Sequence, residues 1–203
     1  MKQRGWRKAV KVAVDRAAAA GGIVALAPVF GAVAAGVAIT MGRPVLFTQK
    51  RAGYKGELFD VIKFRTMTDE RDASGKLLPD EKRLHPFGAF LRRTSLDELP
   101  QLLNVLRGEM SLVGPRPHAI GMKAAERDLQ HIVEEYAHRH RVKPGITGWA
   151  QVNGSRGPIE TPALVRRRLK LDLEYVSRAS LWLDLQILVR TVPALLGDRK
   201  VTR

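Results

Sequence analysis

A run from Ala17 to Gly42 contains no charged residue, and it limits the possible folds more than any other stretch of the chain. About 20 helical residues cross the apolar core of a bilayer, so this run is long enough to enter a membrane. Pro28 stands near its middle, and a proline inside a helix removes a backbone hydrogen bond. The run therefore predicts two helical halves separated by a break at Pro28.

Several interpretations of this run differ in where they place its ends. A signal peptide has an apolar centre of about 7–15 residues, which is shorter than the run. A single spanning helix would separate two flanks that are both basic, although basic flanks prefer the cytoplasmic side. An alanine-rich core helix of a soluble domain stays open. We favour a helix–break–helix that enters and leaves the membrane on the same face, hinged at Pro28.

The charge of the chain indicates a polyanionic partner. Its 203 residues include 35 Lys and Arg against 20 Asp and Glu, which gives a net charge of +15. Such an excess suits nucleic acid, an anionic membrane surface or a phosphorylated substrate. There is no cysteine, which excludes disulfides, cysteine-ligated zinc and a thiol nucleophile.

After the uncharged run we expect a small, mostly helical α+β domain with a short β element. Apolar, β-branched segments bounded by glycine are typical of strands, and apolar residues at a spacing of three and four are typical of helices. The segments expected to be regular are strands over 45–47 and 58–62 and helices over 123–141 and 164–196. Charged residues over 69–83 predict a loop. Arg166, Arg167, Arg168 and Lys170 predict a basic helix face suited to anionic headgroups.

Two adjacent carboxylates, Asp97 and Glu98, are the candidate catalytic groups. Ser95 precedes Glu98 by three residues in a capping-box pattern, and leucines follow at helical spacing. Because Pro100 disfavours a helical conformation at the residue before it, we place both carboxylates at the N-terminal end of a helix rather than inside it. Acidic residues there also stabilise the helix by roughly 0.3–1 kcal/mol, so a purely structural role stays open.

Two further stretches have ambiguous signals. Lys63 and Arg65 flank Phe64, a pattern compatible with nucleic-acid contact, phosphate contact or a solvated edge. The segment over 142–157 is dense in glycine and contains Arg156, so its backbone can approach a ligand closely. It lacks the Gly-Lys-Ser/Thr end of a P-loop, and such a loop can equally consist of turns.

Three motifs together resemble the bacterial sugar transferases. They are KFRTM (Lys63–Met67), TSLDELPQLLNVLRGEMSLVGPRPHA (Thr94–Ala119) and KPGITGWAQVNG (Lys143–Gly154). The resemblance runs from about Lys11 to Thr191. The family comprises monotopic phosphoglycosyl transferases, which start membrane-linked glycan assembly.

The resemblance implies a reaction. A sugar 1-phosphate would move from a UDP-sugar to undecaprenyl phosphate, with release of UMP, through a covalent aspartyl intermediate and with Mg²⁺. Asp97 matches the nucleophile and is also the expected metal ligand, and Glu98 matches its catalytic partner. A carboxylate is a weak nucleophile and needs a phosphorus whose charge is neutralised, which Mg²⁺ and nearby cations would supply.

The resemblance also implies the substrate contacts. Lys63 matches an active-site lysine, and Arg116, between Pro115 and Pro117, matches a phosphate-binding arginine whose planar fork suits phosphate oxygens. The further residues expected to bind substrate or phosphate are Arg65, Arg156 and Asp172. PRPHA and the Arg-Gly that follows Ser155 resemble the branch that transfers glucose or galactose phosphate rather than an N-acetylated sugar. Ser155 departs from that branch, which often has tryptophan at this position.

The organisation implied is residues 1–42 as a basic N-terminus and re-entrant membrane helix, and residues 43–203 as a catalytic domain with amphipathic interfacial helices. That domain would lie on the cytoplasmic face of the inner membrane, against anionic lipids. One alternative is a basic nucleic-acid-binding module, which the net charge favours; the uncharged run and the lack of a binding motif oppose it, so we expect no nucleic-acid partner. Another is a non-catalytic membrane scaffold, which the presence of both Asp97 and Glu98 opposes. The oligomeric state has no signal in the sequence.

Overall fold

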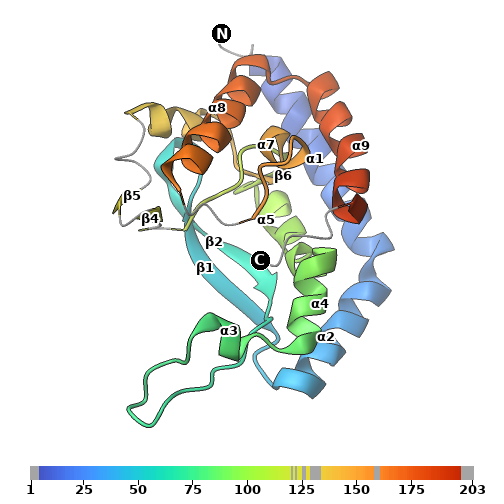
Figure 1. The fold of residues 1–203 in the computed structure, drawn as a ribbon. Coiled ribbons are helices and arrows are strands. Elements are labelled where there is room, and N and C mark those ends of the chain that lie inside the picture. Colours follow the sequence, from blue (N-terminus) through green and yellow to red (C-terminus); the bar gives the residue numbers. More distant parts are fainter. Residues whose placement is uncertain are drawn as a thin grey trace.

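The computed structural model describes residues 5–119, 121, 123–124, 127–128, 134–157 and 161–197. It is an α+β fold in which helices pack beside a two-stranded hairpin (Figure 1). The elements of the first half are α1 (Gly5–Ala25), α2 (Ala27–Met41), β1 (Leu46–Ala52), η1 (Tyr54–Gly56), β2 (Leu58–Phe64), α3 (Asp80–Arg83), α4 (Pro86–Thr94), η2 (Leu96–Glu98) and α5 (Gln101–Arg107). Those of the second half are β3 (Ser111–Val113), β4 (Lys123–Ala124), β5 (Arg127–Asp128), η3 (Glu134–Arg141), β6 (Gly145–Thr147), α7 (Trp149–Val152), α8 (Pro162–Arg178) and α9 (Leu181–Gly197).

Helices α1 and α2 form a pair bent by 64°. The break lies at Leu26, between the two helices, and Pro28 occupies the first turn of α2. Proline has no N–H to donate to the preceding turn, and its ring crowds the carbonyl four residues earlier, so the helix cannot continue straight. Within the described residues, α1 and α2 together have the length and apolar composition of a membrane-crossing segment, while no helix has both by itself.

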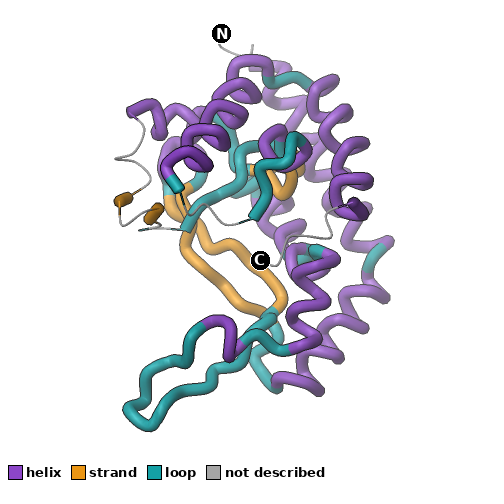
Figure 2. Tube along the Cα trace, in the orientation of Figure 1, coloured by secondary structure: helices purple, strands orange, loops and turns teal. Residues whose placement is uncertain are grey.

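The predicted strands form an antiparallel hairpin. β1 pairs with β2 from Leu46 opposite Phe64 to Ala52 opposite Leu58, so the first strand continues further than its apolar residues indicate. Asn104 of α5 attaches this hairpin to the helices. Its side chain accepts from Ile62 N (3.1 Å) and donates to Asp60 O (2.8 Å). Figure 2 shows helices along one side of the hairpin and the loop before α4 projecting from its end.

In the glycine-dense segment over 142–157, two glycines allow close packing against the backbone at Gly114. β6 runs parallel to β3, and a Cβ on Gly145 would lie 2.0 Å from Gly114 N. A Cβ on Gly148 would lie 2.2 Å from Gly114 O. The close approach expected for a ligand is therefore made, at these two positions, by the backbone of the chain itself.

Three local predictions were wrong. Segment 123–141 contains the β4–β5 pair and the 3-10 helix η3 in place of one long α-helix. Tyr136 and Arg139 both contact His118, and their spacing of three suits a 3-10 turn.

Ser95 has a left-handed conformation (φ 58°) and caps no helix with its side chain, so the capping box is absent. Arg168 is buried and donates to Ser155 Oγ and Gly157 O, so it is not on the exposed basic face. The two helices expected over 164–196 are confirmed as α8 and α9.

The N-terminal pair shares its core with the rest of the fold. Ala19 of α1 packs with Val61, Val105 and Met110. Val33 and Val37 of α2 pack with Phe64 and Leu91. Figure 1 accordingly shows α1 and α2 lying along one flank of the molecule, beside α5 and α4.

Candidate active site

The acidic pair, Asp97 and Glu98, lies on the single 3-10 turn η2 between α4 and α5. The left-handed Ser95 ends α4 and redirects the chain, and Pro100 starts α5. Asp97 is 4% exposed and Glu98 is 5% exposed. Burying a carboxylate is costly unless cations or hydrogen bonds compensate its charge, so the pair needs the cations described next.

Glu98 is held by two cations from distant parts of the chain. Arg116 forms a two-pronged ion pair with it, with Nη1 3.0 Å from Oε2 and Nη2 2.5 Å from Oε1. Lys63 of β2 places Nζ 3.2 Å from Oε1. Asp97 also interacts electrostatically with both cations. The structure thus brings together four of the predicted site residues.

Burial and charge act in opposite directions on the two cations. Burial lowers the pKa of Lys63 below its ordinary value, although Glu98 and Asp97 oppose the shift. Burial also disfavours charged Arg116, but the attraction and hydrogen bonds of Glu98 outweigh it and raise its pKa. Arg116 therefore stays charged, while the protonation of Lys63 depends on the nearby carboxylates.

Arg51 is a site residue that the sequence analysis missed. Its guanidinium donates to Pro117 O (2.8 Å) and Gln49 Oε1 (2.6 Å). Burial and the neighbouring Arg116 lower its pKa to about 10, against the opposing effect of Glu98. In the sequence Arg51 is one basic residue among several in a flank, and only its contacts with Pro117 and Ala119 bring it to the site.

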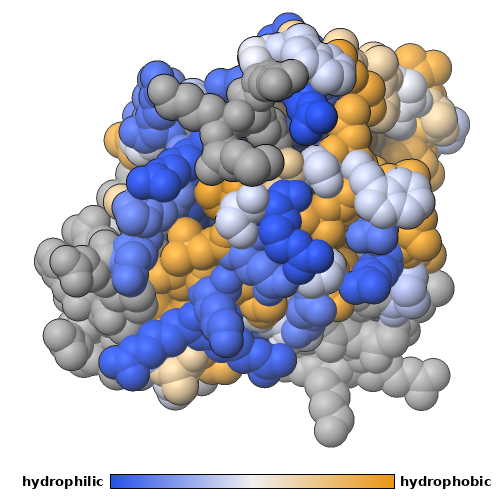
Figure 3. Space-filling model, turned by 90° about the horizontal axis from the view of Figure 1, so that it is seen from above, coloured by the Kyte–Doolittle hydropathy of each residue, from blue (hydrophilic) through white to orange (hydrophobic). Residues whose placement is uncertain are grey.

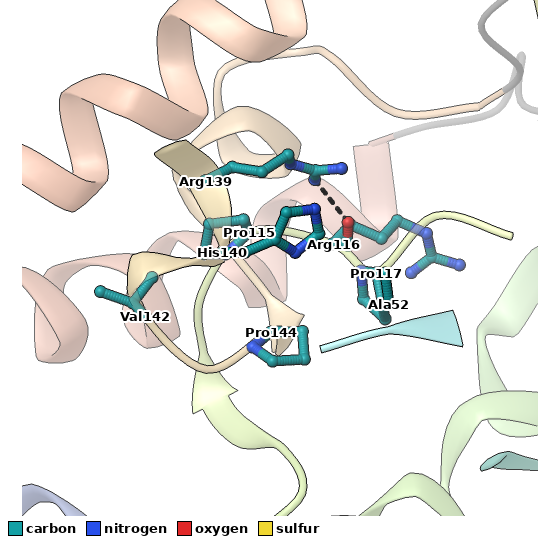
Figure 4. Close-up of a pocket in the computed structure, with 8 residues that line it drawn as sticks. All are labelled: Ala52, Pro115, Arg116, Pro117, Arg139, His140, Val142 and Pro144. Carbon is teal, nitrogen blue, oxygen red and sulfur yellow. Dashed lines mark hydrogen bonds between the residues drawn. The ribbon is translucent and has the colours of Figure 1, made fainter. Parts of the chain in front are cut away.

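A buried network supports Arg116 from behind. Arg139 donates to the Arg116 carbonyl (2.6 Å), as Figure 4 shows for the small cavity beside the Pro115–Pro117 segment. Arg139 also pairs with Asp172 at 2.8 Å and contacts His118 Nδ1 at 2.6 Å. Asp172 therefore reaches the site through Arg139; its contacts make it a positioning residue, while its predicted contact with substrate stays a prediction.

The contacts of Arg65 lead away from the acidic pair. Its guanidinium donates to the carbonyls of Met41, Gly42 and Arg43, at the end of α2, and pairs with Asp69 at 3.5 Å. These bonds satisfy carbonyls that a helix C-terminus leaves without partners. The structure thus gives Arg65 a helix-capping position, and its expected phosphate contact has no support from these bonds.

An apolar cavity of about 440 Å³ opens beside the acidic pair. Arg156 lies at this cavity, with Nη2 3.5 Å from Ser95 Oγ. Glu98 lies in its wall, and Gly22 and Leu26, at the bend between α1 and α2, line another part of it. The cavity therefore connects the acidic pair with the bend.

The donor set around Asp97 fits Mg²⁺. Glu98 is engaged by Arg116 and Lys63, and the described residues contain no cluster of three or more potential metal ligands. Mg²⁺ commonly takes one or two carboxylates together with water and substrate phosphates. The expectation that Asp97 would hold the ion stays a prediction.

A buried acidic pair among cations, next to an apolar cavity, has the charge and polarity that a phosphorylated substrate with an apolar portion requires. The chain belongs to the bacterial sugar transferase family, whose model matches residues 6–198.

Curated relatives are consistent with this assignment. The chain is 48% identical over 190 residues to an undecaprenyl-phosphate glucose phosphotransferase of Komagataeibacter xylinus, covering 92% of this chain and 36% of that protein. It is 44% identical to a UDP-glucose:undecaprenyl-phosphate glucose-1-phosphate transferase of Xanthomonas campestris pv. campestris, covering 93% and 39%. It is 45% identical to the exopolysaccharide production protein PSS of Rhizobium leguminosarum bv. phaseoli, covering 90% and 93%. The chain therefore spans less than half the length of the first two relatives.

Proposed function

We propose that this chain transfers a sugar 1-phosphate, preferably glucose or galactose 1-phosphate, from a UDP-sugar to undecaprenyl phosphate and releases UMP. The observation that carries the proposal is the buried acidic pair with Lys63, Arg116 and Arg51 around it. Three cations against two carboxylates leave a net positive charge, which favours binding of a diphosphate. The names of the relatives supply the donor and the acceptor, and family membership favours this reaction over nucleic-acid binding or a scaffold.

In the first step a carboxylate oxygen of Asp97 attacks the phosphorus that carries the sugar. The bond from this phosphorus to the UMP oxygen breaks, and UMP leaves with the electron pair. In the second step a phosphate oxygen of undecaprenyl phosphate attacks the same phosphorus and releases the Asp97 carboxylate. Bound Mg²⁺ would polarise the diphosphate and neutralise part of its charge.

Glu98 organises the cations for this chemistry. Its carboxylate holds the Arg116 fork and the Lys63 ammonium beside Asp97 before substrate arrives. Phosphate oxygens offer arginine the same two-pronged geometry as a carboxylate, so an arriving diphosphate can take the place of Glu98 on Arg116. The cations then neutralise the phosphorus that Asp97 attacks.

The membrane arrangement follows from the helix pair and the exposed apolar residues. The proposal places the α1–α2 bend within one leaflet of the inner membrane and the acidic pair at its cytoplasmic face. Exposed apolar side chains on α2 and α9 suit such a setting; they include Ile39 (84% exposed), Trp182 (68%) and Val189 (66%). The apolar cavity would receive the first isoprenoid units of the acceptor beside Glu98 and Arg156.

The test is UMP release by detergent-solubilised protein with undecaprenyl phosphate and Mg²⁺. UDP-glucose, UDP-galactose and UDP-N-acetylglucosamine would be compared as donors. We expect lipid-dependent release with a hexose donor and a loss of at least about 100-fold in Asp97→Asn, because the amide is not a nucleophile of this kind. Asp80→Asn, an exposed site on α3, is the matched control. Wild-type release from Asp97→Asn would refute the assigned nucleophile.

A further inference from the structure

A second cavity, of about 520 Å³, shares no lining residue with the apolar cavity. It lies between the start of α1, η1, η3 and the end of α8, and we call it the basic cavity. Figure 3 views the molecule from the end where α1 begins and shows hydrophilic and hydrophobic surface side by side. The cations that line the cavity are Lys8, Lys11, Arg141 and Lys143.

Ion pairs and hydrogen bonds join the charged groups at the floor of the basic cavity. Lys11 Nζ lies 2.7 Å from Asp184 Oδ2 and 3.4 Å from Asp15 Oδ2. Tyr175 donates to Asp184 Oδ1 at 2.7 Å, and Ser111 donates to Asp15 Oδ2 at 2.7 Å. One lysine against two carboxylates leaves one negative charge at the floor, which offsets part of the charge of the other cations at the cavity.

The other lining cations, Lys8, Arg141 and Lys143, form the rim of the cavity, and Arg16 lies outside the lining but next to Lys143. Arg16 and Lys143 lie over Gly108, where a Cβ would be 2.8 Å from Arg16 Nη2 and 3.5 Å from Lys143 Nζ. Lys8 donates to the Tyr54 hydroxyl at 3.0 Å. Across the described ranges, no ion pair joins Lys8, Arg16, Arg141 or Lys143 to a carboxylate.

A structural role accounts for only part of this cluster. Gly108 follows the C-terminus of α5, and the dipole of a helix stabilises cations near its C-terminus. That effect fits Arg16 and Lys143. It gives no reason for Lys8 and Arg141, or for a hollow between them. Burial, and then repulsion from Arg16 and Lys8, lowers the pKa of Lys143, although Asp15 opposes the shift; a bound anion would reduce this repulsion.

We infer that the basic cavity binds a phosphate group attached to an apolar moiety, at a site distinct from the acidic pair. The rim cations would hold the phosphate through charge-assisted hydrogen bonds. Apolar walls from Val12, Val113, Val142 and Val176 suit the remainder of the ligand. A membrane lipid headgroup and a soluble phosphate ester share this chemistry. Lys8 to Arg16 directly precede the uncharged run, a position compatible with headgroups.

The experiment measures thermal unfolding of the full chain in neutral detergent. Separate titrations use dihexanoyl phosphatidylglycerol, dihexanoyl phosphatidylcholine and inorganic phosphate at constant ionic strength. A ligand that binds the folded state raises the unfolding temperature in a saturable way. The variant Arg141→Gln/Lys143→Gln removes two rim charges. Lys76→Gln/Lys82→Gln removes two exposed charges from the loop before α4 and is the matched control.

We expect the cavity variant to need at least about tenfold more anion for the half-maximal shift, because two charge-assisted bonds are lost, while the control behaves as wild type. If the cavity variant weakens the response to phosphatidylglycerol alone, the ligand is a lipid headgroup. If it also weakens the response to inorganic phosphate, the site accepts free phosphate. The inference would be overturned if the unfolding temperature of cavity variant and control responded equally to the anions. It would also be overturned if neither anion raised the unfolding temperature in a saturable way. If the double variant unfolds too early to titrate, Lys8→Gln against Lys76→Gln supplies the same comparison. Because the readout is binding, its failure is distinguishable from failure of the proposed transferase activity.

Discussion

At the scale of single residues, the site is a balance of buried charges. Glu98 keeps Arg116 charged, and Arg139 holds the Arg116 backbone from the other side. His118 completes this support, with Nδ1 2.7 Å from the Tyr136 hydroxyl. These contacts explain why residues that do not reach Asp97 still decide where Arg116 lies.

The stability of the protein should depend on pH through His118. Burial, and then the charge of Arg139, holds the pKa of His118 well below its usual 6.5. Between that lowered pKa and about 6.5, the unfolded chain binds a proton that the folded chain does not. The free energy of unfolding therefore falls as pH drops below about 6.5, by up to about 1.4 kcal/mol per pH unit from this group.

Thermal unfolding between pH 5 and pH 7.5 checks this expectation. His118→Gln should flatten the decline below pH 6.5. His138→Gln changes an exposed histidine of η3 and should retain the decline. An identical pH slope in wild type and His118→Gln would contradict the assignment.

At the scale of elements, the site depends on close contacts between backbones. Helix α4 precedes the acidic pair and packs its Gly88 directly on the end of the hairpin. A Cβ on Gly88 would lie 1.9 Å from the Thr66 carbonyl oxygen. The position of η2 is thus fixed by an approach that only glycine allows.

Gly88→Ala should lower the free energy of unfolding by about 3 kcal/mol, since the methyl group meets backbone that cannot move aside cheaply. Helix propensity alone would favour alanine by up to about 1 kcal/mol. Gly21→Ala in α1, where no atom lies within 4 Å of the added Cβ, is the control and should be neutral or stabilising. Similar unfolding temperatures for both variants would show that the Gly88 contact is not limiting.

At the scale of the whole molecule, the bent pair of α1 and α2 is both the candidate membrane segment and part of the core. The same pair packs through Ala19, Val33 and Val37 onto the hairpin and the central helices. The apolar cavity begins at this bend and ends at the acidic pair. Under the proposed membrane arrangement, insertion and the geometry of the acidic pair would share one structural element.

Pro28→Leu restores a backbone donor and should straighten the pair, moving the N-terminus across the membrane in a fraction of molecules. The chain has no cysteine, so Ala9→Cys and Ser74→Cys can report the two sides by labelling intact cells with an impermeant maleimide. We expect outside labelling at position 9 only with Pro28→Leu. Pro193→Leu, inside α9, is the control. Protection of both positions in the Pro28 variant would refute the hinge.

The sequence by itself determined the features that depend on neighbouring residues. Pro28 set the helix break, apolar segments bounded by glycine indicated the two strands, and the motifs containing Asp97 and Arg116 indicated the family. Such features follow from local backbone chemistry or from short motifs. They include most of the candidate site.

Only the tertiary structure decided the features that depend on distant contacts. Arg51 comes to the site through its contacts with the segment that follows β3, and Arg65 turns to the end of α2 because three carbonyls there need donors. Arg168 is buried because Ser155 and Gly157 accept its hydrogen bonds. The sequence does not reveal which acceptor a charged side chain will contact. Its role is set by whichever buried acceptor the fold brings within hydrogen-bonding distance.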